Sequence, residues 1–124
     1  MMKIKNIKFI SVAAKEAELI VSDGVNECLV FSQPCKLKVG DEFFEPIKVL
    51  DADNLMKVIN ENEKERIQRS DESYFAHHCI VKVIDKEAGI VSIGGIKMEL
   101  ERKIPGWANE GDLIEFTCSR LDIW

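Results

Sequence analysis

Apolar and polar residues alternate over much of the chain, which is the pattern of β-strands with one buried face. In residues 96–100 three apolar residues alternate with a lysine and a glutamate, and residues 114–119 repeat the pattern. Successive side chains of a strand point to opposite faces, so each segment places its apolar residues on one side. Residues 2–12 are rich in isoleucine and lysine, and their alternation breaks near Asn6, as a β-bulge would cause.

Two dipeptides, Asp23-Gly24 and Gly94-Gly95, each separate two segments rich in apolar residues. This arrangement predicts β-hairpins with two-residue turns, in which type I′ geometry places Gly24 and Gly95 at positive φ. A third turn, at residues 86–89, follows the apolar segment 79–84. Residues 79–100 therefore predict a three-stranded meander.

One segment, residues 52–69, has the features of a helix. It contains no glycine or proline, and Leu55, Met56 and Ile59 recur at helical spacing. Asp53 is a suitable N-cap. We expect a helix that closes one end of a β-barrel, with the charged residues of its second part facing solvent.

The chain contains a candidate internal repeat, in which residues 34–51 align without a gap on residues 105–122. Five of the eighteen positions are identical, among them a Gly-Asp pair that precedes a strand. Each copy follows a predicted hairpin, so both halves have the order hairpin, proline turn, Gly-Asp turn and strand. The alternative is a chance match, because Gly-Asp is common turn chemistry.

Length and composition are those of one small globular domain over residues 1–124. The formal charge is −5, from 17 lysines and arginines against 22 aspartates and glutamates. Residues 51–73 carry three of the five excess negative charges, because seven acidic residues stand there against four basic ones. Nucleic-acid-binding proteins normally display a positive surface, since neutralised phosphates supply much of the affinity. The charge therefore disfavours a nucleic-acid partner.

Four cysteines, at positions 28, 35, 79 and 118, would permit two disulfides. The N-terminal residues alternate lysine with isoleucine, unlike the uninterrupted apolar run of a signal peptide. The chain also lacks a stretch of about 18 apolar residues that could cross a membrane. We therefore expect a cytoplasmic protein, outside the membrane, with reduced thiols.

The segment His77-His78-Cys79 is the best candidate for a metal site or a hydrolase. Neighbouring residues of a strand point to opposite faces, so the two histidines cannot bind one ion without a bulge. No second pair of closely spaced ligands follows, and motifs for phosphate binding, nucleotide binding and serine or metal hydrolysis are absent. We expect no catalytic residue, no bound metal and no cofactor.

Tyr74, Trp107 and Trp124 are among the aromatic residues least committed to a core, because they lie in or beside loops or at the last position. Large aromatic side chains in such positions are enriched in protein-binding surfaces. Glu61 and Glu65 belong to the acidic middle segment, which suits a basic partner. These five residues are the predicted partner-binding residues.

Residues 52–124 resemble an OB-fold, with a helix, a strand pair joined by a glycine turn, and Gly111-Asp112 before a last long strand. Barrels of this kind often bind single-stranded nucleic acid or oligosaccharide on one sheet face. The chain lacks the basic groove with interleaved aromatic residues that the nucleic-acid-binding versions use. The expected fold is mainly β: an OB-like or duplicated-meander barrel of about six to eight strands with one helix.

The first hypothesis for function is a small, acidic, non-enzymatic protein that binds a protein partner. It is similar in size and charge to immunity proteins that block a toxin. The first alternative is an OB-like binder of single-stranded nucleic acid that uses Lys3, Lys5 and Lys8 with Tyr74 or Trp107. The second alternative is a hydrolase or a metal protein that uses the His77-His78-Cys79 segment.

Overall fold

The computed structural model describes residues 1–124 and contains strands and loops but no helix. Twelve strands form one mixed sheet that does not close into a barrel. The prediction of a mainly β fold is confirmed, and the predicted barrel of about six to eight strands is not found. The strands are β1 (Met2–Ser11), β2 (Glu16–Ser22), β3 (Glu27–Ser32), β4 (Glu42–Phe43), β5 (Ile47–Leu50), β6 (Asp53–Lys57), β7 (Arg66–Arg69), β8 (His77–Asp85), β9 (Ile90–Ile93), β10 (Ile96–Glu99), β11 (Leu113–Cys118) and β12 (Arg120–Ile123).

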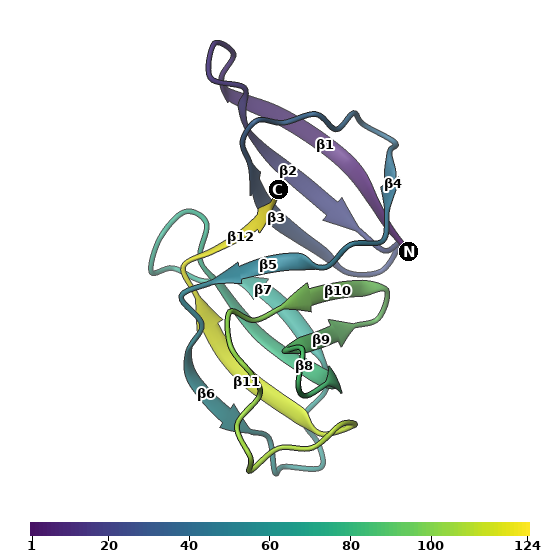
Figure 1. Ribbon diagram of the computed structural model, residues 1–124, viewed down its shortest axis with the longest axis vertical. Helices are drawn as coiled ribbons and strands as arrows, with labels where there is room; N and C mark the ends of the chain where they lie inside the picture. Colours follow the sequence, from purple (N-terminus) through teal and green to yellow (C-terminus); the bar gives the residue numbers. More distant parts are fainter.

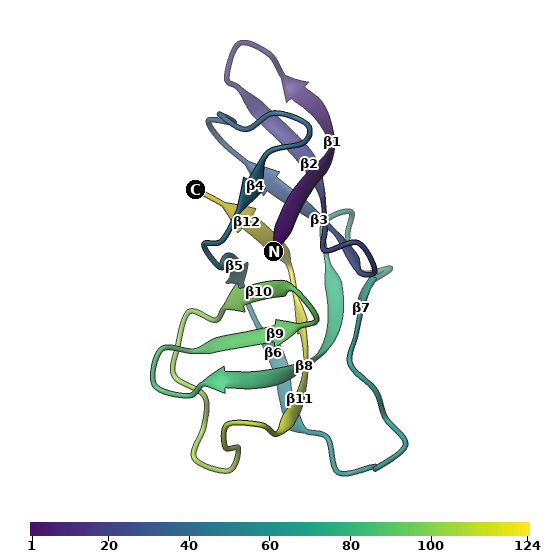
Figure 2. The ribbon, with the colours of Figure 1, turned by 90° about the vertical axis from the view of Figure 1, so that its right-hand side faces the viewer.

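The order of the strands in the sheet is symmetric about its centre, because β1, β2, β3 and β4 on one side correspond to β8, β9, β10 and β11 on the other. It runs β4-β1-β2-β3-β12-β5-β10-β9-β8-β11-β6, and β7 pairs with β8 outside this path. The N-terminal half (β1–β4) and the C-terminal half (β8–β11) lie on opposite sides of β5 and β12 (Figure 1), along the long direction of the molecule (Figure 2). β12, which follows the C-terminal half in the sequence, pairs in parallel with β3 of the N-terminal half. β5, which follows the N-terminal half in the sequence, pairs in parallel with β10 of the C-terminal half. Each half therefore has a fifth strand that comes from the other half of the chain.

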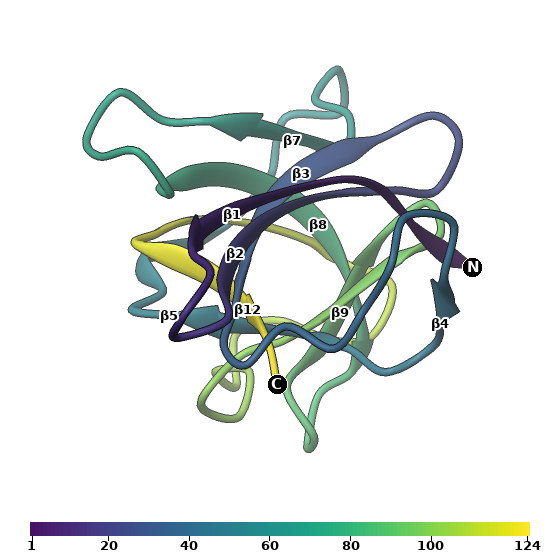
Figure 3. The same ribbon diagram turned by 90° about the horizontal axis from the view of Figure 1, so that it is seen from above.

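This exchange of strands explains why the sheet stays open. β5 and β12 pair with each other in antiparallel fashion, with Leu121 opposite Val49. The sheet therefore continues from one half into the other through these two strands, although β1, β2 and β3 curve strongly when they are seen from above (Figure 3). One apolar core of 24 buried residues draws its members from both halves.

The repeat predicted from the sequence is visible in the two Gly-Asp turns. The carboxylate of Asp41 accepts a hydrogen bond from the backbone N–H three residues before it at 2.8 Å, and that of Asp112 does the same at 2.9 Å. Gly40 and Gly111 have φ values of 93° and 92°, a region that favours glycine. The two turns have the same conformation.

Both turns also join the first strand of their half in the same way. The N–H of Ile4 donates to the carbonyl of Asp41 at 2.9 Å, and the N–H of Gly40 donates to the carbonyl of Ile4 at 2.8 Å. Val83 makes the same two bonds, each at 2.9 Å, with the corresponding residues of the second turn. The alignment of residues 34–43 on residues 105–114 is therefore a structural repeat and not a chance match.

The end of the proposed alignment does not correspond in space. Asp51 lies in a bend after β5 with a φ of 55°, whereas Asp122, its partner in the alignment, lies within β12 and is buried. The identical Leu-Asp pairs at these positions therefore lie in different local structures.

The Gly94-Gly95 turn is a two-residue turn, because Ile93 and Ile96 are opposite each other in the hairpin. Only Gly94 has a positive φ, at 54°, which is typical of a type II′ turn rather than type I′. The prediction that Gly95 needs positive φ is therefore wrong. The meander over residues 79–100 is confirmed as β8, β9 and β10.

The first predicted hairpin turn is longer than expected. Ser22 pairs with Glu27, so four residues separate β2 from β3. The carboxylate of Asp23 accepts bonds from the N–H groups of Val25 at 2.8 Å and Asn26 at 2.7 Å. An aspartate whose carboxylate accepts hydrogen bonds from the following backbone N–H groups stabilises a turn, and here the turn has four residues instead of the predicted two.

The predicted helix over residues 52–69 is wrong, because this segment contains β6, a loop over residues 58–65 and β7. β6 pairs with β11 and β7 pairs with β8, and Leu55 and Ile67 pack against the core. Asn54 has a φ of 55°, which a right-handed helix excludes. Pairing with distant strands overrides the local helix propensity. The predicted bulge near Asn6 is confirmed by a register shift in β1.

Candidate functional site

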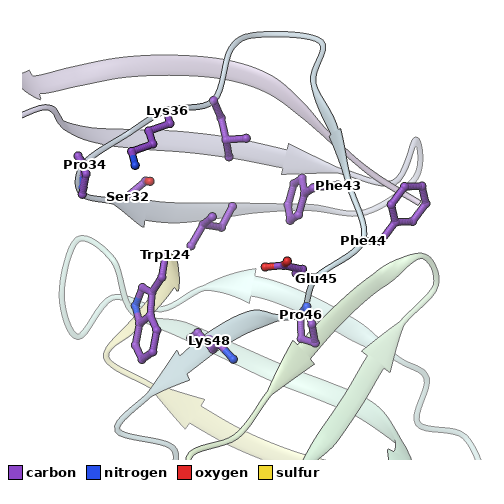
Figure 4. Close-up of a pocket in the computed structure, with 11 residues that line it drawn as sticks. Ser32, Pro34, Lys36, Phe43, Phe44, Glu45, Pro46, Lys48 and Trp124 are labelled. Atoms are coloured by element: carbon purple, nitrogen blue, oxygen red, sulfur yellow. The ribbon is translucent and has the colours of Figure 1, made fainter.

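A groove of about 750 Å³ lies between the segment over residues 33–46 and the central strands β5 and β12. Figure 4 shows its wall of aromatic, proline and charged side chains. The lining residues are Ser32, Pro34, Lys36, Leu37, Phe43, Phe44, Glu45, Pro46, Lys48, Ile123 and Trp124. We call this hollow the loop groove.

The aligned halves of the chain differ at a residue that lines the loop groove. Phe116 lies in β11 and is one of the largest fully buried side chains of the protein. In the repeat its counterpart is Glu45, which lines the loop groove. β11 continues for six residues, whereas β4 has only two and is followed by Pro46, which has no N–H to donate. The N-terminal half therefore lacks the phenylalanine that fills the other half.

The aromatic residues of the loop groove stand at its two sides. Phe43 and Glu45 point into the groove and Phe44 points away from it, while Trp124 lies on the opposite side (Figure 4). Trp124 is 80% exposed and Phe44 is 70% exposed. Exposed large aromatic side chains around an apolar groove are typical of a binding surface.

Charged groups of the loop groove are few and of mixed sign. The Lys48 ammonium lies 5.6 Å from the centre of the Trp124 ring and forms an ion pair with Glu99. Lys36 and Glu45 form no ion pair. The groove is therefore mainly apolar with two free charges, one of each sign.

A second, smaller hollow of about 500 Å³ contains Tyr74. The Tyr74 hydroxyl donates to the Glu18 carboxylate at 3.0 Å, and this bond raises the pKa of the phenol. The Arg69 guanidinium lies 4.8 Å from the centre of the same ring. In the same hollow the Ser119 hydroxyl donates to Asp51 at 2.8 Å. A serine that donates directly to a carboxylate, without a histidine between them, lacks the general base of a serine hydrolase.

The structure does not bring the five predicted partner-binding residues together. Trp124 lines the loop groove, Tyr74 lines the second hollow, and Trp107 lies in the loop between β10 and β11, 45% exposed and in neither hollow. Glu61 and Glu65 lie in the loop between β6 and β7, where Glu65 is 3.8 Å from Lys82. These residues form several separate surfaces.

Most residues of the loop groove, in particular Phe43, Phe44 and Glu45, are not among the residues predicted from the sequence. One signal was present in the sequence. Adjacent side chains of an extended segment point to opposite faces, so Phe43 and Phe44 cannot both pack into the core of the N-terminal half. Only the folded structure places Trp124 across the groove from them.

The histidines of the predicted metal or hydrolase segment have other partners. Nε2 of His77 accepts the N–H of Leu29 at 3.2 Å, and Nδ1 donates to the carbonyl of Phe75 at 2.9 Å. Burial lowers the pKa of His77 from 6.5 to about 4, so the ring is neutral at pH 7. His78 lies 2.6 Å from Glu115, and no group of three or more possible metal ligands is found.

All four cysteines are free and buried. Burial raises the pKa of the Cys28 thiol far above its usual value. The hydrogen bond to Cys118 raises the pKa of Cys79, and the same bond lowers that of Cys118. Buried thiols without access to solvent behave as small apolar side chains and not as nucleophiles.

The lysines proposed for nucleic-acid binding are partly neutralised. Lys3 lies 3.9 Å from Glu42, and Lys5 forms an ion pair with Glu27. Lys8 has no acidic partner. A single free lysine is not a positive surface for a phosphate backbone.

No helix in this structure has the length and apolar character needed to cross a membrane. No family model, no curated protein and no solved structure matches the chain.

Proposed function

We propose that the chain is a non-enzymatic binding protein that takes up an apolar segment of a protein partner in the loop groove. The observation that supports the proposal is the groove itself, about 750 Å³ in volume and bordered by the exposed aromatic residues Phe44 and Trp124. Grooves of this size with apolar walls and few polar groups are the usual form of a binding site. An inhibitor or an immunity-like protein is one form of this function.

The arrangement of polar groups supports binding rather than catalysis. The histidine–carboxylate pair of His78 and Glu115 and the serine–carboxylate pair of Ser119 and Asp51 line no part of the loop groove. A catalytic centre needs such groups beside the bound substrate. We also propose the cytoplasm as the compartment, which agrees with four free thiols.

The experiment is affinity capture from a native lysate with three versions of the protein. Trp124→Ala removes an aromatic wall of the loop groove, and Trp107→Ala removes an exposed tryptophan that lies in neither hollow. We expect mass spectrometry to find a protein that is captured by the parent and by Trp107→Ala and lost with Trp124→Ala. Equal capture by all three versions would overturn the proposal.

A further inference from the structure

The C-terminal half contains two strands that have no counterpart in the N-terminal half: β7, which pairs with β8, and β6, which ends the sheet. β6 pairs with β11 along the edge that faces away from β8, with Met56 opposite Glu115 and Lys57 opposite Ile114. β4, the counterpart of β11, pairs with β1 on one side and ends the sheet on the other. The C-terminal half therefore holds a strand at a position that is vacant in the N-terminal half.

The hydrogen-bonding pattern shows which groups of the β4 edge are free. The N–H of Ile4 donates to the carbonyl of Asp41, and Met2 lies opposite Phe43. Residues of an antiparallel strand point their backbone groups alternately to the two sides, so those of Glu42 in β4 point away from β1. β4 ends at Phe43, and an extended continuation by one residue gives the backbone groups of Phe44 the same direction as those of Glu42. In the repeat Phe44 corresponds to Glu115, whose backbone faces Met56 of β6.

The loop groove lies beside this free edge. Phe43, the last residue of β4, lines the groove, and so do Phe44 and Glu45, which follow directly after the strand. In the sequence alignment of the two halves Glu45 corresponds to Phe116, which is fully buried. A strand added along β4 could place one large side chain there.

We infer that the loop groove binds an extended segment of a partner protein, which pairs antiparallel with β4 as β6 pairs with β11 and places one large apolar side chain where Phe116 lies in the C-terminal half. The inference rests on the proposed function and specifies how the partner is held. Backbone bonds along a sheet edge supply affinity in this mode, and pockets for alternate side chains supply specificity.

A second copy of the chain fits this edge less well than another protein does. Pairing two β4 edges in antiparallel fashion would bring the unpaired Glu45 side chains and the Glu42 side chains of both copies onto one short ladder. Like charges opposite each other destabilise a sheet. The net charge of −5 also opposes self-association.

The probe is a phage-displayed library of random ten-residue peptides, selected on the purified full chain. Enriched peptides are synthesised, and their affinity is measured by fluorescence anisotropy. We expect them to carry a large apolar residue in an extended context. Amide hydrogen exchange, followed by NMR, then reports on the edge itself. Peptide addition should slow exchange of the Phe44 N–H, while the Phe43 N–H, which already faces Met2, should change little.

Two pairs of variants separate the groove from the edge. Glu45→Phe supplies the missing phenylalanine and should bind the peptides at least about a hundredfold more weakly than Glu45→Gln, which also removes the charge but leaves the space open. Phe44→Pro removes the N–H at the edge and should weaken binding about fivefold to tenfold, the effect of one hydrogen bond. This effect is measured relative to Phe44→Ala, which loses the same ring but keeps the N–H. Thermal melts verify that each variant is folded.

The outcomes distinguish the two proposals. Peptides that lose affinity with Glu45→Phe but leave the Phe44 amide unprotected would overturn strand addition and leave groove binding standing. The strand proposal would be overturned if the peptides bind Glu45→Phe as tightly as the parent, or if the library yields no binder. In either case the lysate capture with Trp124→Ala tests the proposed function separately. Protection of the Phe44 amide that rises with protein concentration without peptide would show a second copy at the edge and also overturn the inference.

Discussion

The carboxylate of Asp23 accepts a hydrogen bond from the backbone N–H of Gly95 at 2.8 Å. Asp23 lies in the turn between β2 and β3, and Gly95 lies in the counterpart turn between β9 and β10. One side chain therefore holds the two equivalent turns of the repeat against each other. The same carboxylate also binds the backbone of its own turn.

Replacing Asp23 by Asn should lower stability at pH 7 by about 1 to 2 kcal/mol, with allowance for partial exposure. Burial alone raises the pKa of this carboxyl, but bonds from the N–H groups of Asn26, Val25 and Gly95 outweigh it and lower the pKa from 3.8 to about 2. A lowered carboxyl pKa stabilises the fold above pH 3.8, and the gain is lost as the pH falls to 2. Denaturant titrations at pH 7 and pH 2 measure it. Glu61→Gln, an exposed loop change, is the control and should alter stability by less than about 0.5 kcal/mol. A difference between Asp23→Asn and the parent that is independent of pH would contradict this account.

Gly94→Ala should destabilise the protein by roughly 1 to 3 kcal/mol. Gly94 has a φ of 54°, and an added Cβ would lie 2.5 Å from the Asp23 carboxylate oxygen. Gly95 has no positive φ, and its Cβ would meet neighbours at 3.0 Å, so Gly95→Ala should cost less. Gly106→Ala is the matched control, because it has open space and no positive φ. Denaturant midpoints of the three variants measure the order of their stabilities. A Gly95→Ala protein that is less stable than Gly94→Ala would contradict the type II′ assignment.

Stability should rise steeply between pH 4 and pH 6.5 because of His77. Its pKa is about 4 in the folded state and 6.5 in the unfolded chain, so the unfolded state binds the proton in this interval. The stabilisation is complete above pH 6.5 and is lost as the pH falls to 4, a change of about 3 kcal/mol. Urea titrations over this range measure the slope.

His77→Gln should flatten this dependence on pH, and it should also lower stability at pH 7 because the buried N–H of Leu29 loses its acceptor. Trp107→Ala, an exposed substitution that changes no titratable group, should keep the slope. An unchanged slope in His77→Gln would show that other groups cause the dependence on pH.

The four thiols should be unreactive in the native protein. Cys28, Cys35, Cys79 and Cys118 are all buried, and none forms a disulfide. We expect no fast reaction with a thiol-specific chromogenic disulfide until denaturant is added, and then four equivalents. Melting temperatures with and without reductant should agree within about 5 °C, which corresponds to roughly 1 kcal/mol for a domain of this size. A larger shift would reveal a disulfide in solution.

The hydrophobic pattern by itself determined several parts of this protein. It predicted the meander over residues 79–100 and the bulge near Asn6. The gapless alignment of residues 34–51 on residues 105–122 indicated a candidate repeat, with a chance match as the alternative. These features depend on short-range rules: alternation along a strand and backbone conformations that glycine favours. Such rules operate within a few residues, so one sequence is enough to read them.

Tertiary structure decided the rest. The segment over residues 52–69 has the composition of a helix, yet β6 and β7 form because β11 and β8 offer unpaired edges. The loop groove combines residues of the segment over residues 33–46 with Trp124, which lies far from them in the sequence. Strand pairing and cavity filling depend on residues far apart in sequence, and the free energy of those contacts outweighs local propensity. The hydrophobic periodicity of a segment does not determine which distant strand it pairs with.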